Sequence, residues 1–271
     1  MKFLKARTGS LDILLQMGRR SILQRYRGSW LGLGWAFLTP LFMLIVYTFI
    51  FTRVFTVRWG QDVSAGNVGD LGTFEFAVVL FAGLSVHTFF SEVVLSAAGI
   101  IPANTNYVKK VIFPLRVLPI VELVSAAFQL IISLIILLIF QFVITQTLPP
   151  TTLLIPIVLI PLFLMMAGLS WILAGLGVYM RDITQVLAPL VTALLFLGPI
   201  LYPASSFSPE VRPWLTLNPV TVPVEALRDL VIWGVMPDWG QLGIYMLVAS
   251  FMFLLGWKLF SMMRPGFADV L

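Results

Sequence analysis

The 271-residue sequence contains no cysteine and a single histidine, His87. The lack of cysteine excludes disulfides, thiolate metal sites and a thiol nucleophile. One histidine cannot build the multi-histidine metal sites of the HExxH type. The sequence also has no GxxxxGK[ST] motif, the loop that cradles nucleotide phosphates in many ATPases. These absences argue against a catalytic, metal or nucleotide-binding centre, so no cofactor is expected in this chain.

Charged residues are also scarce, at 11% of the chain, whereas apolar residues make up 59%. Soluble domains carry about a quarter charged residues. With a mean hydropathy of +1.00, the chain has more apolar side chains than one soluble core of this length could bury. A lipid bilayer accommodates this composition. The sequence predicts an all-α membrane protein, because a helix satisfies its own backbone hydrogen bonds in lipid.

Long uncharged stretches predict six membrane spans in a single membrane domain that covers residues 1–271. Each stretch is long enough to cross a hydrocarbon layer of about 30 Å as a helix. Pro149 and Pro150 divide the longest stretch into two spans, because paired prolines interrupt a helix. The first apolar run begins near Trp30 and is too long for the apolar part of a cleaved leader, so we expect it to be retained. The spans are predicted near residues 30–54, 75–99, 118–145, 152–178, 183–203 and 239–259.

The distribution of Lys and Arg predicts the orientation of these spans. Six spans place both termini on one side, and thirteen of the 17 basic residues fall on that side. The other side keeps Arg53, Arg58, Arg212 and Arg228. Because basic residues accumulate on the cytoplasmic side of membrane proteins, both termini are predicted to be cytoplasmic. The clustered cations thus encode topology, and nucleic-acid binding is not expected.

Residues 1–29 precede the first span and contain a predicted amphipathic helix from Ser10 to Arg27. Ser10 can cap this helix, and Asp12 suits the positive end of its dipole. Apolar and polar side chains fall on opposite faces at helical spacing. The apolar face holds Leu11, Leu14, Leu15, Ile22 and Tyr26. Such a helix lies along membrane lipids of the inner leaflet, either only as an anchor or also as a contact for a cytoplasmic partner.

Ionisable groups inside the predicted spans are few, and such groups often mark functional sites. Glu92 lies near one end of the second span, and Glu122 begins the third. Glu92 could serve an ion-driven transporter, but its position near a helix end favours contact with headgroup water or a neighbouring helix. His87 is likewise interpreted as a helix-contact residue. In the fourth span, Ala167, Ser170, Ala174 and Gly177 recur at helical spacing and predict close helix packing.

Aromatic residues, by contrast, are abundant, with 22 Phe, 8 Trp and 6 Tyr. Many aromatic side chains of membrane proteins face lipid or its interfaces. The crowding in the first two spans nevertheless favours a passage lined by flat rings and few charges. Such a passage suits sugars, because the C–H faces of pyranose rings stack weakly on aromatic rings and a chain can slide. The predicted lining residues are Trp35, Phe37, Phe42, Tyr47, Phe51, Phe81 and Phe89.

Short motifs follow the order of the spans. RYRGSWLG at residues 25–32, with Trp35 and Pro40 after it, leads into the first span, and NYVKKVIFP at residues 106–114 follows the second. Arg181-Asp182 joins the fourth and fifth spans. After the fifth come Tyr202-Pro203 and Asn218-Pro219, ahead of Glu225 and Arg228. This ordered set resembles the ABC-2 type permeases that export bacterial cell-surface polysaccharides, and it covers nearly the whole chain.

The resemblance implies the membrane subunit of an ATP-driven exporter in the bacterial inner membrane. The expected cargo is a lipid-linked polysaccharide, O-antigen above all, with capsule, teichoic acid, or a drug, haem or lipid molecule as alternatives. The resemblance also implies a homodimer that binds two copies of a separate ATPase subunit, which would hold the ATP and Mg. It implies a channel at the dimer interface, walled mainly by the first, second and fifth spans. Residues 203–233 are expected to form short re-entrant helices that close this channel on the outside.

The motifs also carry expected roles on the cytoplasmic side. Arg25, Tyr26 and Arg27 are expected where the substrate enters, because guanidinium groups suit the anionic diphosphate of a lipid carrier; headgroup anchoring is the other interpretation of the two arginines. The resemblance implies a coupling element from Asn106 to Phe113 and a second ATPase contact between spans four and five. The expected coupling residues are Asn106, Tyr107, Lys109, Lys110, Phe113, Arg181 and Asp182.

Two other function classes are less consistent with the sequence. A secondary transporter usually carries midplane charges and internal repeats, and neither is visible here. A membrane-bound transferase would need a catalytic carboxylate motif in a cytoplasmic loop, and no spacing of the acidic residues indicates one. The residues therefore favour a transport subunit that catalyses no reaction itself.

Overall fold

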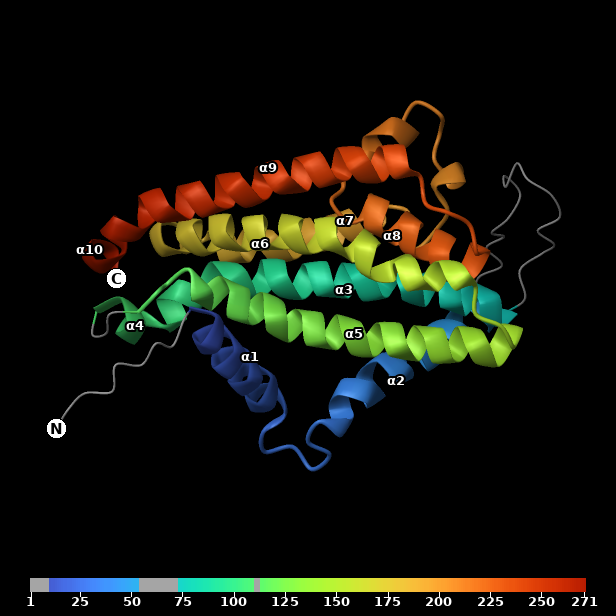
Figure 1. Ribbon diagram of the computed structural model, residues 1–271, viewed down its shortest axis with the longest axis horizontal. Helices are drawn as coiled ribbons and strands as arrows, with labels where there is room; N and C mark the ends of the chain where they lie inside the picture. The colour runs from blue at the N-terminus through green and yellow to red at the C-terminus, as the bar shows by residue number, and fades with distance from the viewer. Residues whose placement is uncertain (1–9, 54–72, 110–112) are drawn as a thin grey trace.

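The computed structural model describes residues 10–53, 73–109 and 113–271, and these ranges form helices and turns without a strand (Figure 1). Helix α1 (Ser10–Tyr26) and helix α2 (Gly34–Arg53) form a V against one side of a bundle of long helices. The long helices of that bundle are α3 (Thr73–Ala103), α5 (Val117–Thr145), α6 (Ile155–Tyr179) and α9 (Trp239–Met263). A shorter helix, α7 (Ile183–Phe196), packs against α3.

Short elements occupy the two ends of the bundle. At the end that holds the described C-terminus, the elements are α4 (Thr105–Lys109), η5 (Arg264–Gly266) and α10 (Phe267–Val270). At the other end, η1 (Pro150–Leu154) precedes α6. Between α7 and α9 lie η2 (Ala204–Ser206), η3 (Arg212–Leu217), α8 (Thr221–Arg228) and the π-helical turn η4 (Asp229–Trp233).

Four helical stretches in the described ranges are long and apolar enough to cross a membrane. They are Phe76–Ala103, Val117–Thr145, Pro150–Tyr179 and Trp239–Val270, which agree with the predicted second, third, fourth and sixth spans. Two shorter apolar helices, Gly34–Ile50 and Ile183–Phe196, stand where the first and fifth spans are predicted. The all-α prediction is confirmed for the described residues, and the count of six spans stays a prediction.

The fifth apolar segment ends earlier as a helix than the predicted boundary near residue 203. Helix α7 stops at Phe196, and turns replace the helix through Ile200. The chain carries Gly198 and Pro199 here, and the residue before a proline is disfavoured in the helical conformation. Proline also lacks the backbone N–H that would continue the helix. The helix therefore breaks inside an apolar sequence that hydropathy alone reads as continuous.

Small residues bring the long helices into direct backbone contact. A side chain added at Gly177 of α6 would collide with the carbonyl of Ala98 on α3. Gly168 of α6 and Gly256 of α9 face each other, and a methyl group on either would collide with the backbone of the opposite helix. Since lipid provides no hydrophobic drive for helix association, such close packing carries much of the stability. The predicted close packing at Gly177 is confirmed, whereas the Gly168–Gly256 contact was not predicted.

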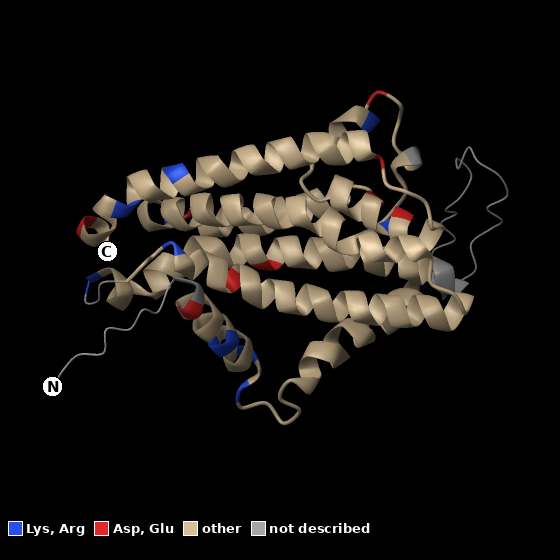
Figure 2. Ribbon diagram, in the orientation of Figure 1, with Lys and Arg blue, Asp and Glu red and all other residues tan. Residues whose placement is uncertain are grey.

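The core follows helix α3, whose side chains from Phe76 to Phe90 are almost all buried. A smaller apolar cluster closes the bundle near the C-terminus, where Phe267 of α10 packs edge-on against Phe260 of α9. Lys and Arg gather on α1, on α4 and near the end of α9, which lie toward one end of the bundle (Figure 2). This distribution is the one on which the predicted orientation rests.

The predicted orientation can be tested by cysteine labelling, since the natural chain has no cysteine. Ser208 and Asn106 lie in segments predicted on opposite sides of the membrane, and both side chains are accessible to solvent. Ser208→Cys should react with an impermeant maleimide added to intact spheroplasts, whereas Asn106→Cys should react only after permeabilisation. Labelling of Asn106→Cys from outside would contradict cytoplasmic termini.

Candidate functional site

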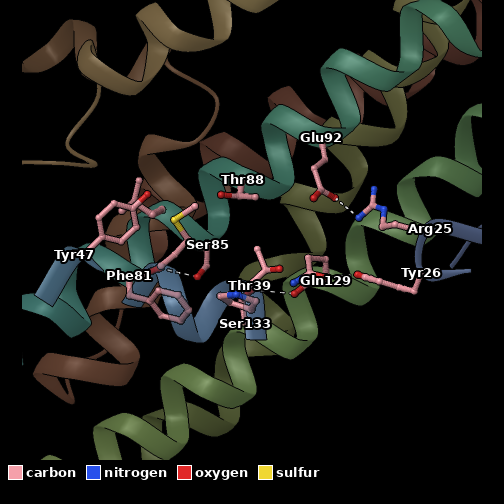
Figure 3. A pocket seen from close by; sticks show the side chains of 13 residues that line it. Arg25, Tyr26, Thr39, Tyr47, Phe81, Ser85, Thr88, Glu92, Gln129 and Ser133 are labelled. Atoms are coloured by element: carbon pink, nitrogen blue, oxygen red, sulfur yellow. Dashed lines mark hydrogen bonds and ion pairs between the residues drawn. The ribbon is translucent and has the colours of Figure 1, made fainter. Parts of the chain in front are cut away.

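A cavity of about 370 Å³ lies between α1, α2, α3 and α5 (Figure 3). Most of its lining side chains are polar, although it lies among apolar helices. The polar lining is Arg25, Tyr26, Thr39, Tyr47, Ser85, Thr88, Glu92, Gln129 and Ser133, and the apolar lining is Pro40, Met43, Phe81 and Leu84. Because polar groups are costly to bury without partners, such a concentration between membrane helices marks a candidate functional site.

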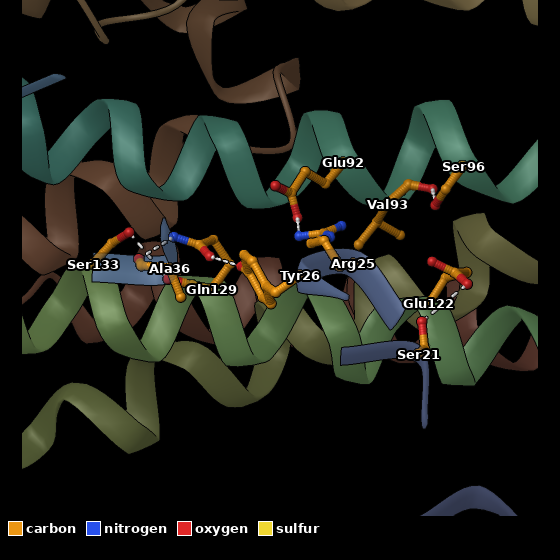
Figure 4. Close-up of polar contacts among 10 residues, drawn as sticks. All are labelled: Ser21, Arg25, Tyr26, Ala36, Glu92, Val93, Ser96, Glu122, Gln129 and Ser133. Carbon is orange, nitrogen blue, oxygen red and sulfur yellow. Dashed lines mark hydrogen bonds and ion pairs between the residues drawn. The ribbon is translucent and has the colours of Figure 1, made fainter. Parts of the chain in front are cut away.

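Helix α1 forms one wall of this cavity and lies against α5. Gly18 sits directly over Val124, where an added methyl group would come within 3.0 Å of that side chain. One turn later, the Ser21 hydroxyl donates to the Glu122 carboxylate at 3.5 Å. The Tyr26 hydroxyl donates to the Gln129 side-chain oxygen at 2.7 Å (Figure 4). Burial raises the pKa of the Tyr26 phenol, which keeps it neutral and able to donate.

Arg25 reaches across the mouth of the cavity to helix α3. Its guanidinium lies 3.0 Å from the Glu92 carboxylate, and both side chains are partly exposed (Figure 4). Burial lowers the pKa of Arg25, because it disfavours the charged guanidinium. The charge of the adjacent Glu92 carboxylate and its hydrogen bond have a larger combined effect in the opposite direction, so the pKa of Arg25 is raised. The pair therefore places two compensating charges at the mouth. Glu92 contacts a neighbouring helix, in agreement with the interpretation that its sequence position favoured.

Two glycines turn the chain between α1 and α2. Gly28 and Gly32 have φ angles of +86° and +51°, which residues with a side chain rarely adopt. The Gln129 amide then donates to the Ala36 carbonyl at 3.0 Å and holds the start of α2 against α5. The glycines of the RYRGSWLG motif thus have a conformational role, and its Arg25 and Tyr26 reach the cavity.

A second set of polar contacts lies at the opposite end of the bundle. The Arg228 side chain is only 1% exposed. It donates to the carbonyls of Val79 on α3 (3.1 Å) and Ile200 after α7 (2.7 Å), and it pairs with Glu225 at 2.9 Å. The Asn218 amide donates to the Leu194 carbonyl at 2.8 Å. These contacts satisfy carbonyls at the broken end of α7 and hold α8 against α3.

Residues 14–232 match the family described as ABC-2 type transporter. The chain belongs to this family. It is 28% identical over 262 residues to the O-antigen export system permease protein RfbA of Myxococcus xanthus, covering 95% of this chain and 94% of the relative. Two Klebsiella pneumoniae proteins of the same name are 25% and 24% identical over 263 residues, with 96% of this chain and 95% of each relative covered. Membership makes this chain a multi-pass membrane subunit of an ABC transporter, whose ATPase is expected to be a separate partner.

The cavity of this ABC-2 chain includes only part of the predicted aromatic lining. Tyr47 and Phe81 line it. Phe89 is buried and packs edge-on against Phe163, with ring centres 5.2 Å apart. The remaining predicted residues lie elsewhere: Trp35, Phe37 and Phe42 are exposed on α2, and the side chain of Phe51 lies outside the described residues. A channel role for these aromatic residues stays a prediction.

The polar lining residues of α3 and α5 were not predicted as site residues, although the sequence holds a periodic signal for them. Ser85, Thr88 and Glu92 recur at helical spacing on α3, as do Gln129 and Ser133 on α5. Each set places its polar groups on one helix face. The two polar faces meet in one cavity because of the way α3 packs against α5. The spacing of residues along the chain does not reveal this packing.

The described members of the predicted coupling set lie at the end of the bundle where Lys and Arg gather. Asn106 and Lys109 lie on α4 with solvent-accessible side chains, while the ring of Tyr107 packs 4.6 Å from that of Phe113. Arg181 and Asp182 are exposed between α6 and α7. Helix α10 contacts both α4 and α6, which places the two predicted contacts near one another. Lys110 lies outside the described residues, and the role of the whole set stays a prediction.

The buried contacts of Arg228 predict that replacing this side chain will strongly destabilise the protein. Arg228→Met would leave the Val79 and Ile200 carbonyls without these donors and should lower the free energy of unfolding by about 3 kcal/mol. Thermal unfolding in detergent would measure this change. Lys258→Met, which removes an exposed cation from α9, serves as the matched control and should change stability little. Equal stability of both variants would show that the buried contacts of Arg228 are dispensable.

Proposed function

We propose that this chain is the transmembrane subunit of an ATP-driven exporter that moves lipid-linked O-antigen across the bacterial inner membrane. Membership of the ABC-2 family and the names of the relatives support export as the function. The observation that carries the cargo class is the cavity beside α1, whose lining combines hydroxyl, amide and aromatic side chains. Capsule and teichoic acid are the alternative cargoes, since both are cell-surface polymers of repeating units.

The lining of the cavity suits an uncharged sugar chain. Hydroxyl and amide groups such as Thr88, Gln129 and Ser133 can exchange hydrogen bonds with sugar hydroxyls, while Tyr47 and Phe81 offer aromatic surface. The charges of Arg25 and Glu92 compensate each other, so the cavity carries little net charge. Conduction requires contacts that are weak and repeated rather than tight. A polysaccharide can satisfy such a lining one sugar unit after another.

The lipid end of the cargo needs a different surface. A groove of about 670 Å³ runs along α1 beside the cavity, with Arg19 and Arg27 among its lining residues. Tyr26 lines both the groove and the cavity, so the two are adjacent. We expect Arg27, together with Arg25 once it leaves Glu92, to bind the diphosphate of the lipid carrier by charge-assisted hydrogen bonds. The sugar chain would then extend into the cavity.

The proposed assembly has six spans, with α2 and α7 as the first and fifth, and both termini in the cytoplasm. Two copies would form a channel at their interface. The exposed aromatic side chains on α2, including Trp35, Phe37 and Phe42, support a position of this helix beside the channel. The short helices from η2 to η4 would then be re-entrant and close the outer side.

The ATPase would bind at the end of the bundle where Lys and Arg gather, and ATP and Mg would be bound to that subunit. Accessible residues of α4 and of the α6–α7 connection, Asn106, Lys109, Arg181 and Asp182, offer the contact surface. Tyr107 and Phe113 support α4 from the protein side. Movement of the ATPase would reach the bundle through these segments.

Export should depend on the arginines of α1. Arg25→Ala combined with Arg27→Ala removes the charge-assisted hydrogen bonds to the diphosphate, so surface polysaccharide should fall about 10-fold while polymer accumulates inside the cell. Immunoblots of surface and intracellular glycan would measure both quantities, with the abundance of the chain as a check. Lys258→Ala is the matched control.

Deletion of the gene provides the test of the cargo. If O-antigen stays at the surface while capsule or teichoic acid disappears, the cargo assignment changes to that polymer. Unchanged surface glycans of every type would contradict the proposed function as a whole.

Coupling to the ATPase should depend on the accessible face of α4. Asn106→Ala combined with Lys109→Ala should leave membrane insertion and complex abundance intact but lower export several-fold per ATP hydrolysed. The measurement is ATPase activity of the purified complex together with surface glycan of the same strain. A double variant that exports normally would show that α4 does not transmit movement through these two residues.

A further inference from the structure

A small cavity lies at the basic end of the bundle, where α1, α4 and the ends of α3 and α5 meet. Its volume is about 190 Å³, and it shares no lining residue with the larger cavity beside α2. Arg20 and Gln24 also line the groove along α1, so the two hollows adjoin. The apolar lining is Met17, Ile100, Leu118 and Val121. The polar lining is Arg20, Ser21, Gln24, Asn104, Tyr107 and Glu122. The lining thus combines apolar and polar parts, which suits an amphiphile.

The polar part contains one cation and one anion that do not pair with each other. Among the described residues, neither Arg20 nor Glu122 takes part in an ion pair. Glu122 accepts a hydrogen bond from the Ser21 hydroxyl at 3.5 Å (Figure 4). A partly buried carboxylate without a counter-ion is unfavourable next to membrane helices. A ligand that brings a positive group to Glu122 and a negative group to Arg20 would compensate both charges.

The position of the cavity agrees with the headgroup layer of the inner leaflet. Glu122 is the sixth residue of α5, so it lies about 8 Å along the axis from the first residue of that helix. The adjoining wall is the amphipathic helix α1, and such helices lie at the boundary between headgroups and acyl chains. A phospholipid can therefore reach the cavity without leaving the membrane.

We propose that this cavity binds the phosphoethanolamine headgroup of an inner-leaflet phospholipid. Arg20 would bind the phosphate, and Glu122 would accept hydrogen bonds from the primary ammonium. The acyl chains would leave along Met17 and Val121. The cavity is smaller than the pockets of about 300–1,000 Å³ that hold whole drug-sized ligands, which fits a headgroup alone. The proposal concerns a lipid site and does not depend on which polysaccharide is exported.

The same chemistry disfavours the other common headgroups. Phosphatidylglycerol brings no positive group, so Glu122 would stay uncompensated beside an added negative charge. The trimethylammonium of phosphatidylcholine has no N–H to donate, and such groups are typically bound by aromatic cages. The primary ammonium donates hydrogen bonds to a carboxylate. Selectivity for phosphatidylethanolamine over both lipids is therefore the signature of the site.

Native mass spectrometry of the purified full-length chain tests this selectivity. The probes are short-chain phosphatidylethanolamine, phosphatidylcholine and phosphatidylglycerol of matched acyl length. Phosphatidylethanolamine should bind about 10-fold more tightly than the other two. Glu122→Gln and Arg20→Gln should each remove that preference, whereas Asp12→Asn and Lys258→Gln, which change exposed charges outside the cavity, should keep it.

Several results would overturn the proposal. Equal binding of the three lipids, or a preference that survives in both Glu122→Gln and Arg20→Gln, would do so. Soluble phosphoethanolamine that competes as well as the lipid would assign the cavity to a free metabolite instead. Melting temperatures in lipid-free detergent identify a misfolded variant; if Glu122→Gln misfolds, the result for Arg20→Gln, at an exposed position, decides between the outcomes.

Discussion

The break in helix α7 is the constraint around which the end of the bundle opposite the C-terminus is built. A helix that stops inside a bundle leaves backbone carbonyls that water cannot reach, and such groups must find donors within the protein. Asn218 and Arg228 supply those donors from a segment more than twenty residues beyond the end of the helix. The same contacts bring α8 against α3 and fix the short helices over the end of the bundle. The architecture of this end thus follows from the need to provide hydrogen-bond donors for the backbone carbonyls at the end of α7.

The two ion pairs of the described residues differ in a way that fits different roles. The Arg228–Glu225 pair has one fully buried partner, and the guanidinium also bonds to backbone carbonyls of two other segments. Removing one member of such a buried set is strongly destabilising. The Arg25–Glu92 pair is partly exposed and joins side chains from only two helices. Partly exposed pairs contribute little to stability, so this pair can open without unfolding the bundle.

Much of the fold could be predicted from the sequence because its cause is local. Lipid demands long apolar helices, and the boundaries of α5, α6 and α9 agree closely with those expected from uncharged stretches. Helix packing at Gly177 was also predictable from the spacing of small residues. The early end of α7 was not predicted, because hydropathy is insensitive to Gly198 and Pro199. The six-span topology itself depends on a membrane and stays a prediction.

The candidate site could be predicted only in part, for a physical reason. Arg25 and Tyr26 were predicted because they belong to the RYRGSWLG motif before the first span, and because a guanidinium group suits a diphosphate. Thr88 and Gln129 did not stand out, since single polar residues in a span usually bond within their own helix or to a neighbour. Their meeting in one cavity depends on contacts between segments distant in sequence. Phe89 was predicted to line a channel, and within the described residues its ring packs against Phe163, so its channel role stays a prediction.

The paired glycines of α6 and α9 have a mechanical consequence. Helices whose backbones touch at Gly168 and Gly256 have no layer of flexible side chains between them, so they cannot slide past one another without collision. Helix α2, by contrast, joins α1 through a turn with two glycines in the left-handed region, and much of its surface is exposed. A swing of α2 about this turn would widen the cavity without moving α6 against α9. The long helices of the bundle would keep their positions while α2 moves.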